Sequence, residues 1–302
     1  MKKFFLFVRV KIELNLESKI SDPLFKKLKP VGSQPPRLYG LAKVHKNEIP
    51  LRPVLSMPGS AYFKIAVQVS EWLFIVEECK INSSTKVIAD SLQHINLNND
   101  REIIRFDVSS LYTNVPVSEA ISNCTNLLFS GRYKQTPVDK ETFRTLLSVC
   151  SQNIIMLTND DYYQQIDGLA IGSLPAPMLA NGWISKFNKT IKGDELFSRY
   201  MDDVLRDIAK NEIEKVLLDI NNLHPLLKLT MERKLKYTWY TKPTDTGLTM
   251  NFYSLASEKY NRSVVSGMIH IIIRPCSTWE SVHESITKAK KILQDNQYPP
   301  SF

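Results

Sequence analysis

Residues 199–205 read RYMDDVL, and the acidic pair Asp202 and Asp203 interrupts this apolar run. Apolar residues on each side of two polar ones are typical of a tight turn between two short strands of a β-hairpin. A third acid, Asp107, follows an apolar stretch and precedes Val108, so we expect it at or near the end of a mostly buried strand. Because an unpaired acid is costly to bury, this placement favours a metal ion or another cation nearby.

Three such carboxylates are what a two-metal phosphoryl-transfer site needs. Two divalent cations require several oxygen ligands while keeping open positions for phosphate. Two adjacent acids alone are more often a solvated turn, so it is the strands predicted around them that favour catalysis. We therefore predict Asp107, Asp202 and Asp203 as catalytic residues and as ligands of two Mg²⁺ ions, which Mn²⁺ can replace, with Asp107 and Asp202 bridging both ions.

Five motifs occur in one order along the chain. They are RLYGLAKVHK at 37–46, PLRPV at 50–54, FDVSSLYTNVP at 106–116, QIDGLAIGS at 165–173 and YMDD at 200–203. This set resembles the reverse transcriptases of Penelope-like retroelements, over nearly the whole chain. Telomerase is a more distant relative with the same polymerase plan. The motifs at 37–46 and 106–116 fit the Penelope pattern better than the telomerase pattern.

The resemblance implies an RNA-directed DNA polymerase with the α+β fold of a right hand. Its palm would be an antiparallel sheet backed by helices, as expected for strands and helices in this order. Residues 1–100 would form the fingers with part of the palm, 101–240 the palm with the carboxylates, and 241–302 a reduced, thumb-like helical region. The implied partners are an RNA template, a DNA primer and deoxynucleotide triphosphates.

Two basic residues, Lys43 and Arg52, match positions that contact the incoming triphosphate in this family. A guanidinium suits bidentate capture of phosphate. The same resemblance assigns template-backbone contacts to Arg37 and Lys46, for which an ordinary surface cation is an equal alternative.

An aromatic ring follows Asp107 by five residues. In related polymerases a ring at the position of Tyr112 lies under the sugar and excludes a 2′-hydroxyl, whereas the alternative is a core tyrosine beside Leu111. Gln165 and Gly172 belong to the motif that lies against the template base and the nascent pair. A glycine there lets backbone approach nucleic acid closely, although a plain turn would have a similar sequence.

The composition fits a folded protein with a polyanionic partner. The 302 residues carry a net charge of +8, and residues 1–60 alone hold twelve Lys and Arg against four acids. The four cysteines lack paired spacing, so we expect no zinc site or disulfide framework and assume the reducing interior of a cell. A nuclear location is implied by the resemblance only. No stretch is long and apolar enough to be a membrane span, so we expect no membrane partner.

Hydrophobic spacing predicts six amphipathic helices. Their apolar positions recur over 65–76, 118–128, 139–150, 177–183, 211–223 and 279–293. The third begins at about Asp139, and Thr278 is positioned to cap the last.

Three departures from the family pattern bear on activity. Pro175 stands one residue later than in the family. Arg206 and Asp207 occupy a strand that is normally apolar, and so predict a short or frayed strand. Relative to the family pattern, about twenty residues are missing after Lys234. The alternatives are a degenerate, inactive retroelement remnant that still binds nucleic acid, and an inert remnant without partners.

Overall fold

The computed structural model describes most of the chain. The described residues are 10, 12–13, 17, 19–43, 48–80, 88, 91, 100–133, 136–192, 196–232, 239, 241, 245–273, 276 and 279–302. The strands are β1 (Arg37–Ala42), β2 (Leu51–Ser56), β3 (Arg101–Val108), β4 (Ile155–Thr158), β5 (Asp161–Gln164), β6 (Phe197–Tyr200), β7 (Asp203–Ala209) and β8 (Leu229–Glu232). The α-helices are α2 (Asp22–Leu28), α3 (Phe63–Leu73), α5 (Leu111–Asn114), α6 (Val117–Leu128), α7 (Lys140–Ser151), α8 (Ala176–Ile184), α9 (Asn188–Ile191), α10 (Ile213–Asn221), α11 (Glu258–Ile273) and α12 (Trp279–Asp295). Short 3₁₀ turns cover Glu77–Cys79 and Ser185–Phe187.

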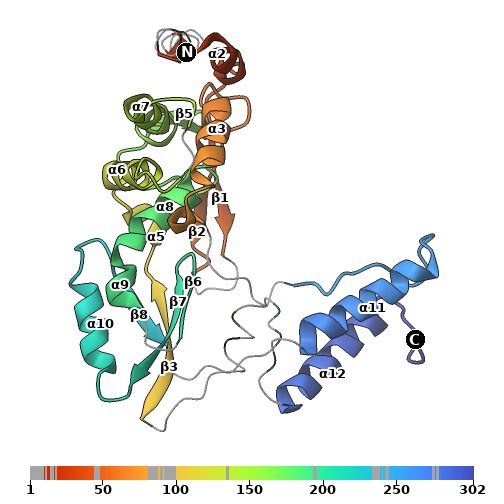
Figure 1. The fold of residues 1–302 in the computed structure, drawn as a ribbon. Helices are drawn as coiled ribbons and strands as arrows, with labels where there is room; N and C mark the ends of the chain where they lie inside the picture. The colour runs from red at the N-terminus through yellow and green to blue at the C-terminus, as the bar shows by residue number, and fades with distance from the viewer. Residues whose placement is uncertain are drawn as a thin grey trace.

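An antiparallel sheet in the order β6-β7-β3-β8 forms one part of this α+β fold. Side chains alternate between the two faces of each strand. One face is apolar, and its residues Phe106, Val108 and Val204 belong to the main hydrophobic core. The opposite face carries Asp107 and, directly across the strand pair, Asp203. Helices α9 and α10 lie along one side of this sheet (Figure 1).

A mixed sheet in the order β2-β1-β4-β5 forms the other part. Strands β1 and β2 pair antiparallel over six residues each, while β1 and β4 pair in parallel. The sheet therefore joins segments from both sides of residue 100, where the sequence predicts a domain boundary.

All six helices predicted from hydrophobic spacing are confirmed, as α3, α6, α7, α8, α10 and α12. The Asp139 side chain caps α7, accepting hydrogen bonds from the backbone N–H groups of Glu141 and Thr142 at 2.9 Å each. Helices α3, α6 and α7 pack together beside the mixed sheet (Figure 1), and each contributes buried apolar side chains to the same core. In α8 the fully buried Trp183 is the largest core side chain.

Strand β7 is neither short nor frayed, so that prediction is wrong. It runs for seven residues and pairs with β3 along its whole length. The Asp207 carboxylate is fully buried, accepts a hydrogen bond from the Leu196 N–H at 2.9 Å, and accepts another from Arg101 Nε at 2.8 Å. The charge of Asp207 is tolerated because it is paired and its oxygens are hydrogen-bonded. Arg206, also buried, donates to the Thr190 carbonyl.

The proline that stands one residue late is accommodated too. Pro175 has φ −76° and occupies the N-cap position of α8, where its missing N–H is not needed. The segment directly after Lys234, where residues are missing relative to the family pattern, lies outside the described residues. So does Thr278, the predicted cap of α12.

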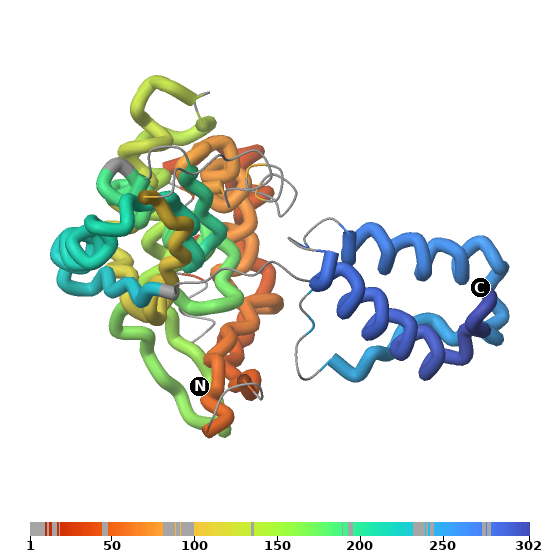
Figure 2. The backbone as a smooth tube through the Cα atoms, turned by 90° about the horizontal axis from the view of Figure 1, so that it is seen from below, coloured from red at the N-terminus to blue at the C-terminus, as the bar shows by residue number. Residues whose placement is uncertain are grey.

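Two long helices, α11 and α12, pack against each other and form a small hydrophobic cluster around Ile272, Val282 and Ala289. Figure 2 shows them side by side and set apart from the two sheets. Sequence spacing predicts α12 but not α11. Within the described part of the chain, no helix is long and apolar enough to cross a membrane.

The Arg101–Asp207 pair leads to a stability prediction. Asp207→Ala removes the buried carboxylate that pairs with the largely buried Arg101, and we expect it to lower the free energy of unfolding by about 3–5 kcal/mol. Lys27→Ala breaks an ion pair with Glu71 whose side chains are more than half exposed, and should cost at most about 1 kcal/mol. Urea unfolding of both variants measures this difference, and equal costs would contradict it.

Candidate active site

The backbone gathers the three predicted acids at one end of the antiparallel sheet. Asp107, near the end of β3, lies directly opposite Asp203, the first residue of β7. The Val108 N–H donates to the Asp202 carbonyl at 2.8 Å, which fixes the β6–β7 turn against the end of β3. Cβ atoms of directly opposite residues are about 5 Å apart, so Asp107 and Asp203 are neighbours on the open face. The predicted hairpin and the predicted strand end are both confirmed.

The turn itself is strained at Met201. This residue has φ +56°, a left-handed conformation that costs a residue other than glycine about 1–2 kcal/mol. The left-handed conformation reverses the chain, so that Asp202 lies in the turn and Asp203 begins β7.

The acids differ in their surroundings. Asp203 Oδ1 accepts two hydrogen bonds from Arg105, at 3.0 Å from Nε and 2.7 Å from Nη2, and both side chains are about 40% exposed. Asp107 and Asp202 are exposed. The carboxylates of Asp107 and Asp202 suit a hard divalent cation. One oxygen of Asp203 is bound by Arg105.

Metal binding stays a prediction. Among the residues that the structure describes, no three His, Cys, Asp or Glu side chains are grouped in a way that could hold a metal ion.

Tyr112 lies beside the turn, and its role as a site residue stays a prediction. It belongs to α5, which begins after a left-handed Ser110 that reverses the chain at the end of β3. Its hydroxyl lies 4.0 Å from the Met201 sulfur. Burial, followed by the negative charges of Asp202 and Tyr200, raises the pKa of Tyr112 to about 12, so the phenol stays neutral at physiological pH.

The loop 165–173 connects Tyr112 with the mixed sheet. The Leu169 N–H donates to the Tyr112 carbonyl at 2.7 Å, and the Leu55 N–H of β2 donates to the Ile171 carbonyl at 2.6 Å. Gln165 donates through its side-chain amide to the Gly168 carbonyl, so it closes its own loop. Gly172 has φ +97° and packs against the Leu55 carbonyl.

The predicted phosphate-binding residues lie on the β1–β2 ribbon. Leu41 pairs with Arg52, and the Lys43 N–H donates to the Pro50 carbonyl at 2.9 Å. Alternation along the strands places Lys43 and Arg52 on the same face, together with Arg37. The structure therefore brings these three cations to one surface of the ribbon, on a different sheet from the acids. Lys46 lies outside the described residues.

Two arginines near the acids were not anticipated. Arg105 precedes Asp107 by two residues, and the two-residue period of a strand could have revealed that both share a face. Arg199 lies on the opposite face, only 1% exposed, and donates through Nη1 to Asn181 Oδ1 at 2.6 Å and to the Met201 carbonyl at 3.4 Å. Burial lowers the pKa of Arg199 to about 10. No sequence signal identifies Asn181 as a partner of Arg199, because it lies in another element, α8, and only the fold brings the two together.

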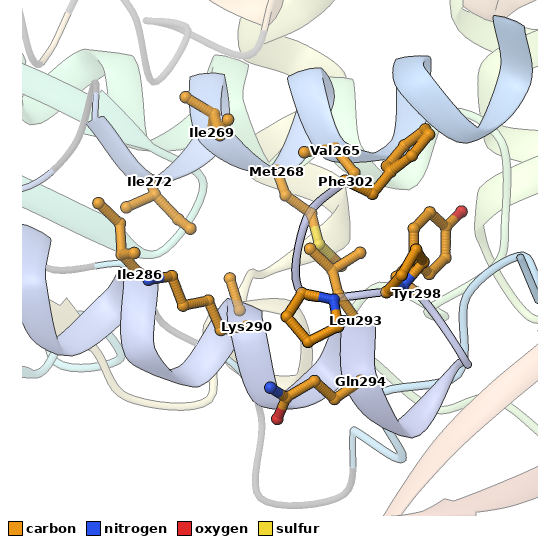
Figure 3. A pocket seen from close by; sticks show the side chains of 13 residues that line it. Val265, Met268, Ile269, Ile272, Ile286, Lys290, Leu293, Gln294, Tyr298 and Phe302 are labelled. Atoms are coloured by element: carbon orange, nitrogen blue, oxygen red, sulfur yellow. The ribbon is translucent and has the colours of Figure 1, made fainter. Parts of the chain in front are cut away.

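A separate pocket of about 340 Å³ lies between α11 and α12. Figure 3 shows Met268, Ile272, Leu293 and Tyr298 around it, and its lining is mainly apolar. It holds no acidic side chain and contains none of the predicted site residues.

The chain was compared with known proteins by sequence and by structure. The model of the animal helix-turn-helix domain matches residues 248–302, which include α11 and α12. No curated protein matches. The structure is similar to telomerase from Candida albicans, solved with a fragment of telomeric RNA, with a TM-score of 0.55 and 12% identity over 92% of this chain and 55% of that one. For telomerase from Candida tropicalis the TM-score is 0.51, with 13% identity over 86% of this chain and 53% of that one.

The chain thus spans about half the length of the telomerase chains that it matches. At this identity the likeness shows the fold alone, which is shared with these telomerase chains.

Close contact at Gly172 leads to a second prediction. A Cβ on residue 172 would collide with the Leu55 carbonyl oxygen, whereas one on Gly131, which also has a positive φ of +83°, would meet nothing within 4 Å. We expect Gly131→Ala to cost about 1 kcal/mol, for backbone strain alone, and Gly172→Ala to cost more than about 2 kcal/mol because strain and collision add. Thermal and urea unfolding compare the two variants. If they are equally stable, the loop does not pack on β2 as described.

Proposed function

We propose that the chain is the RNA-directed DNA polymerase domain of a Penelope-like retroelement, extending a primer 3′-hydroxyl by nucleotidyl transfer. The observation that carries the proposal is the meeting of Asp107 with Asp202 and Asp203 at one end of an antiparallel sheet, in a chain with the fold of telomerase. The ordered motifs at 37–46, 106–116 and 200–203 supply the retroelement assignment.

Asp107 and Asp202 would hold two Mg²⁺ ions, or Mn²⁺ in their place. Such ions, when bound, lower the pKa of the primer hydroxyl and stabilise the charge that develops on the leaving pyrophosphate. Asp203 would contribute less to the metals, because Arg105 holds one of its oxygens in two hydrogen bonds. Arg105 also reduces the repulsion among three neighbouring acids before any metal binds.

The remaining roles fall to side chains outside the acidic cluster. Lys43 and Arg52 would hold the triphosphate from the shared face of the β1–β2 ribbon, and Arg37 on the same face would contact template backbone. Tyr112 would lie under the deoxyribose. Its phenol, which stays neutral, could meet the sugar without adding another negative charge beside Asp202.

The partners would be an RNA template, a DNA primer and deoxynucleotide triphosphates. The excess of eight positive charges within residues 1–60 supports a polyanionic partner. In a right-hand layout, the mixed sheet with α3 would belong to the fingers, the antiparallel sheet to the palm, and α11 with α12 to a reduced thumb.

Two features favour a functional domain over a decayed copy. Two of the departures from the family pattern do not disrupt the fold, because the buried Asp207 is hydrogen-bonded and Pro175 occupies the N-cap position of α8. The three acids are also retained, although an exposed acid contributes little to stability.

Primer extension with Asp202→Asn tests the proposal. The substitution keeps the shape of the side chain and removes the charge that a divalent cation requires, so we expect extension on an RNA template with Mg²⁺ to fall about 1000-fold. Asp219→Asn, an equal charge change on the exposed face of α10, should extend primers as the wild type does. Equal extension by wild type and Asp202→Asn would reject this site as the catalytic one.

The role of Tyr112 is tested by the choice of sugar. Tyr112→Ala removes the ring that would collide with a 2′-hydroxyl, so discrimination against ribonucleotides should fall about 10- to 100-fold. Tyr112→Phe keeps the ring and should keep the discrimination. The measurement is the ratio of kcat/KM for a deoxynucleotide and its ribonucleotide. An unchanged ratio in Tyr112→Ala would leave Tyr112 as a core residue.

A further inference from the structure

Behind the acidic turn lies a buried arginine that the proposed chemistry does not use. Arg199, in β6, points to the face of the sheet opposite the acids and is only 1% exposed. No carboxylate among the described residues pairs with it, and its Nε and Nη2 atoms have no hydrogen-bond partner. Such a cation is costly, since a buried charge is ordinarily paired or fully hydrogen-bonded. Stability alone therefore gives no reason for its presence.

The contacts that Arg199 does make converge on the turn. Its Nη1 donates to the Met201 carbonyl and to Asn181 Oδ1, and the Asn181 amide in turn lies 4.0 Å from the Met201 sulfur. The Tyr112 hydroxyl approaches the same sulfur from another element. Met201 is thus held at its backbone by Arg199 and at its side chain by Asn181 and Tyr112, and it is the residue in the strained left-handed conformation.

The position of Asp202 depends on that conformation. If Met201 relaxed to an ordinary φ, the chain would leave the turn in another direction, and Asp202 would lose the bond from the Val108 N–H that sets it beside Asp107. The Arg199 bond to the Met201 carbonyl is 3.4 Å long, and the shorter 2.6 Å bond to Asn181 holds the guanidinium beside the turn.

We propose that Arg199 is a positioning residue, which with Asn181 braces the Met201 backbone so that Asp202 stays beside Asp107 in the arrangement that binds a divalent cation. The proposal rests on the proposed function for its catalytic consequence, but its effect on cation binding does not require turnover. It assigns Arg199 no contact with substrate.

A methionine replacement separates bracing from ordinary stabilisation. Arg199→Met keeps similar volume and removes the buried charge, and replacing a poorly compensated buried charge by an apolar side chain is often neutral or stabilising. We expect its Tm to equal or exceed that of the wild type, its affinity for Mn²⁺ to fall at least fivefold, and its kcat to fall at least tenfold with the KM for nucleotide within twofold. A purely structural arginine would instead lower Tm and leave kcat of the folded protein unchanged.

The matched control is Arg206→Met. Arg206 is the other buried arginine on the same face of the sheet, and it lies opposite Phe197, away from the turn. Its replacement should leave Mn²⁺ affinity and kcat unchanged. Mn²⁺ binding is measured on the full chain by electron paramagnetic resonance, and kcat and KM by primer extension.

Four outcomes decide the matter. Wild-type affinity for Mn²⁺ in Arg199→Met overturns the positioning role of Arg199. An equal loss of Mn²⁺ affinity in Arg206→Met overturns it too. If Arg199→Met does not fold, Arg199→Lys takes its place, because the lysine ammonium ends about one bond short of the position of Nη1, the atom that donates to both acceptors. Unchanged Mn²⁺ affinity in that variant also overturns the proposal. A wild type that binds Mn²⁺ but extends no primer rejects the proposed function alone. The Mn²⁺ affinities of the wild type and Arg199→Met still test the positioning role of Arg199.

Discussion

The pairing of β3 with β7 is the interaction on which both the core and the acidic cluster depend. In this register Phe106 faces the core opposite Val204, while Asp107 faces the open side opposite Asp203. Because side chains alternate between the faces of a strand, a slip of one residue would bury the acids and expose the core. At the far end of β7 the buried Asp207 is bound by an arginine of β3, which ties the register at the end opposite the acids.

The sheet concentrates charge on both faces near the turn, in different ways. On the open side, solvent and Arg105 moderate the repulsion between the carboxylates. On the buried side, Arg199 is 1% exposed, and no acid in the part of the chain that the structure describes forms an ion pair with it. Both arrangements cost stability, and together with the left-handed Met201 they concentrate strain at one turn. Such local departures from a well-satisfied structure are typical of functional sites.

Sequence patterns predict much of this fold. Long amphipathic stretches and the RYMDD hairpin are predicted correctly, because their periodicity reflects burial on one face. Helix α11 is missed since its sequence is rich in Val and Ile, which favour strands, and only packing against α12 makes it a helix. The frayed β7 is a wrong prediction for a related reason: a charge in a strand is unfavourable until its partner, Arg101, is known, and that partner lies far away in sequence. The contacts of Arg199 likewise depend on α8 and are invisible to local pattern.

The loop 165–173 determines how the two sheets relate near the acids. It bonds to β2 through Ile171 and to the Tyr112 carbonyl through Leu169, so a shift of the β1–β2 ribbon must move either the loop or Tyr112. Tyr112 in turn contacts Met201, the strained residue of the turn. Cations on the ribbon and acids on the antiparallel sheet are therefore linked through a short chain of backbone bonds and packed side chains. Rigid linkage of this kind is what a reaction between two separately held substrates requires, because small misplacements of the reacting groups cost large factors in rate.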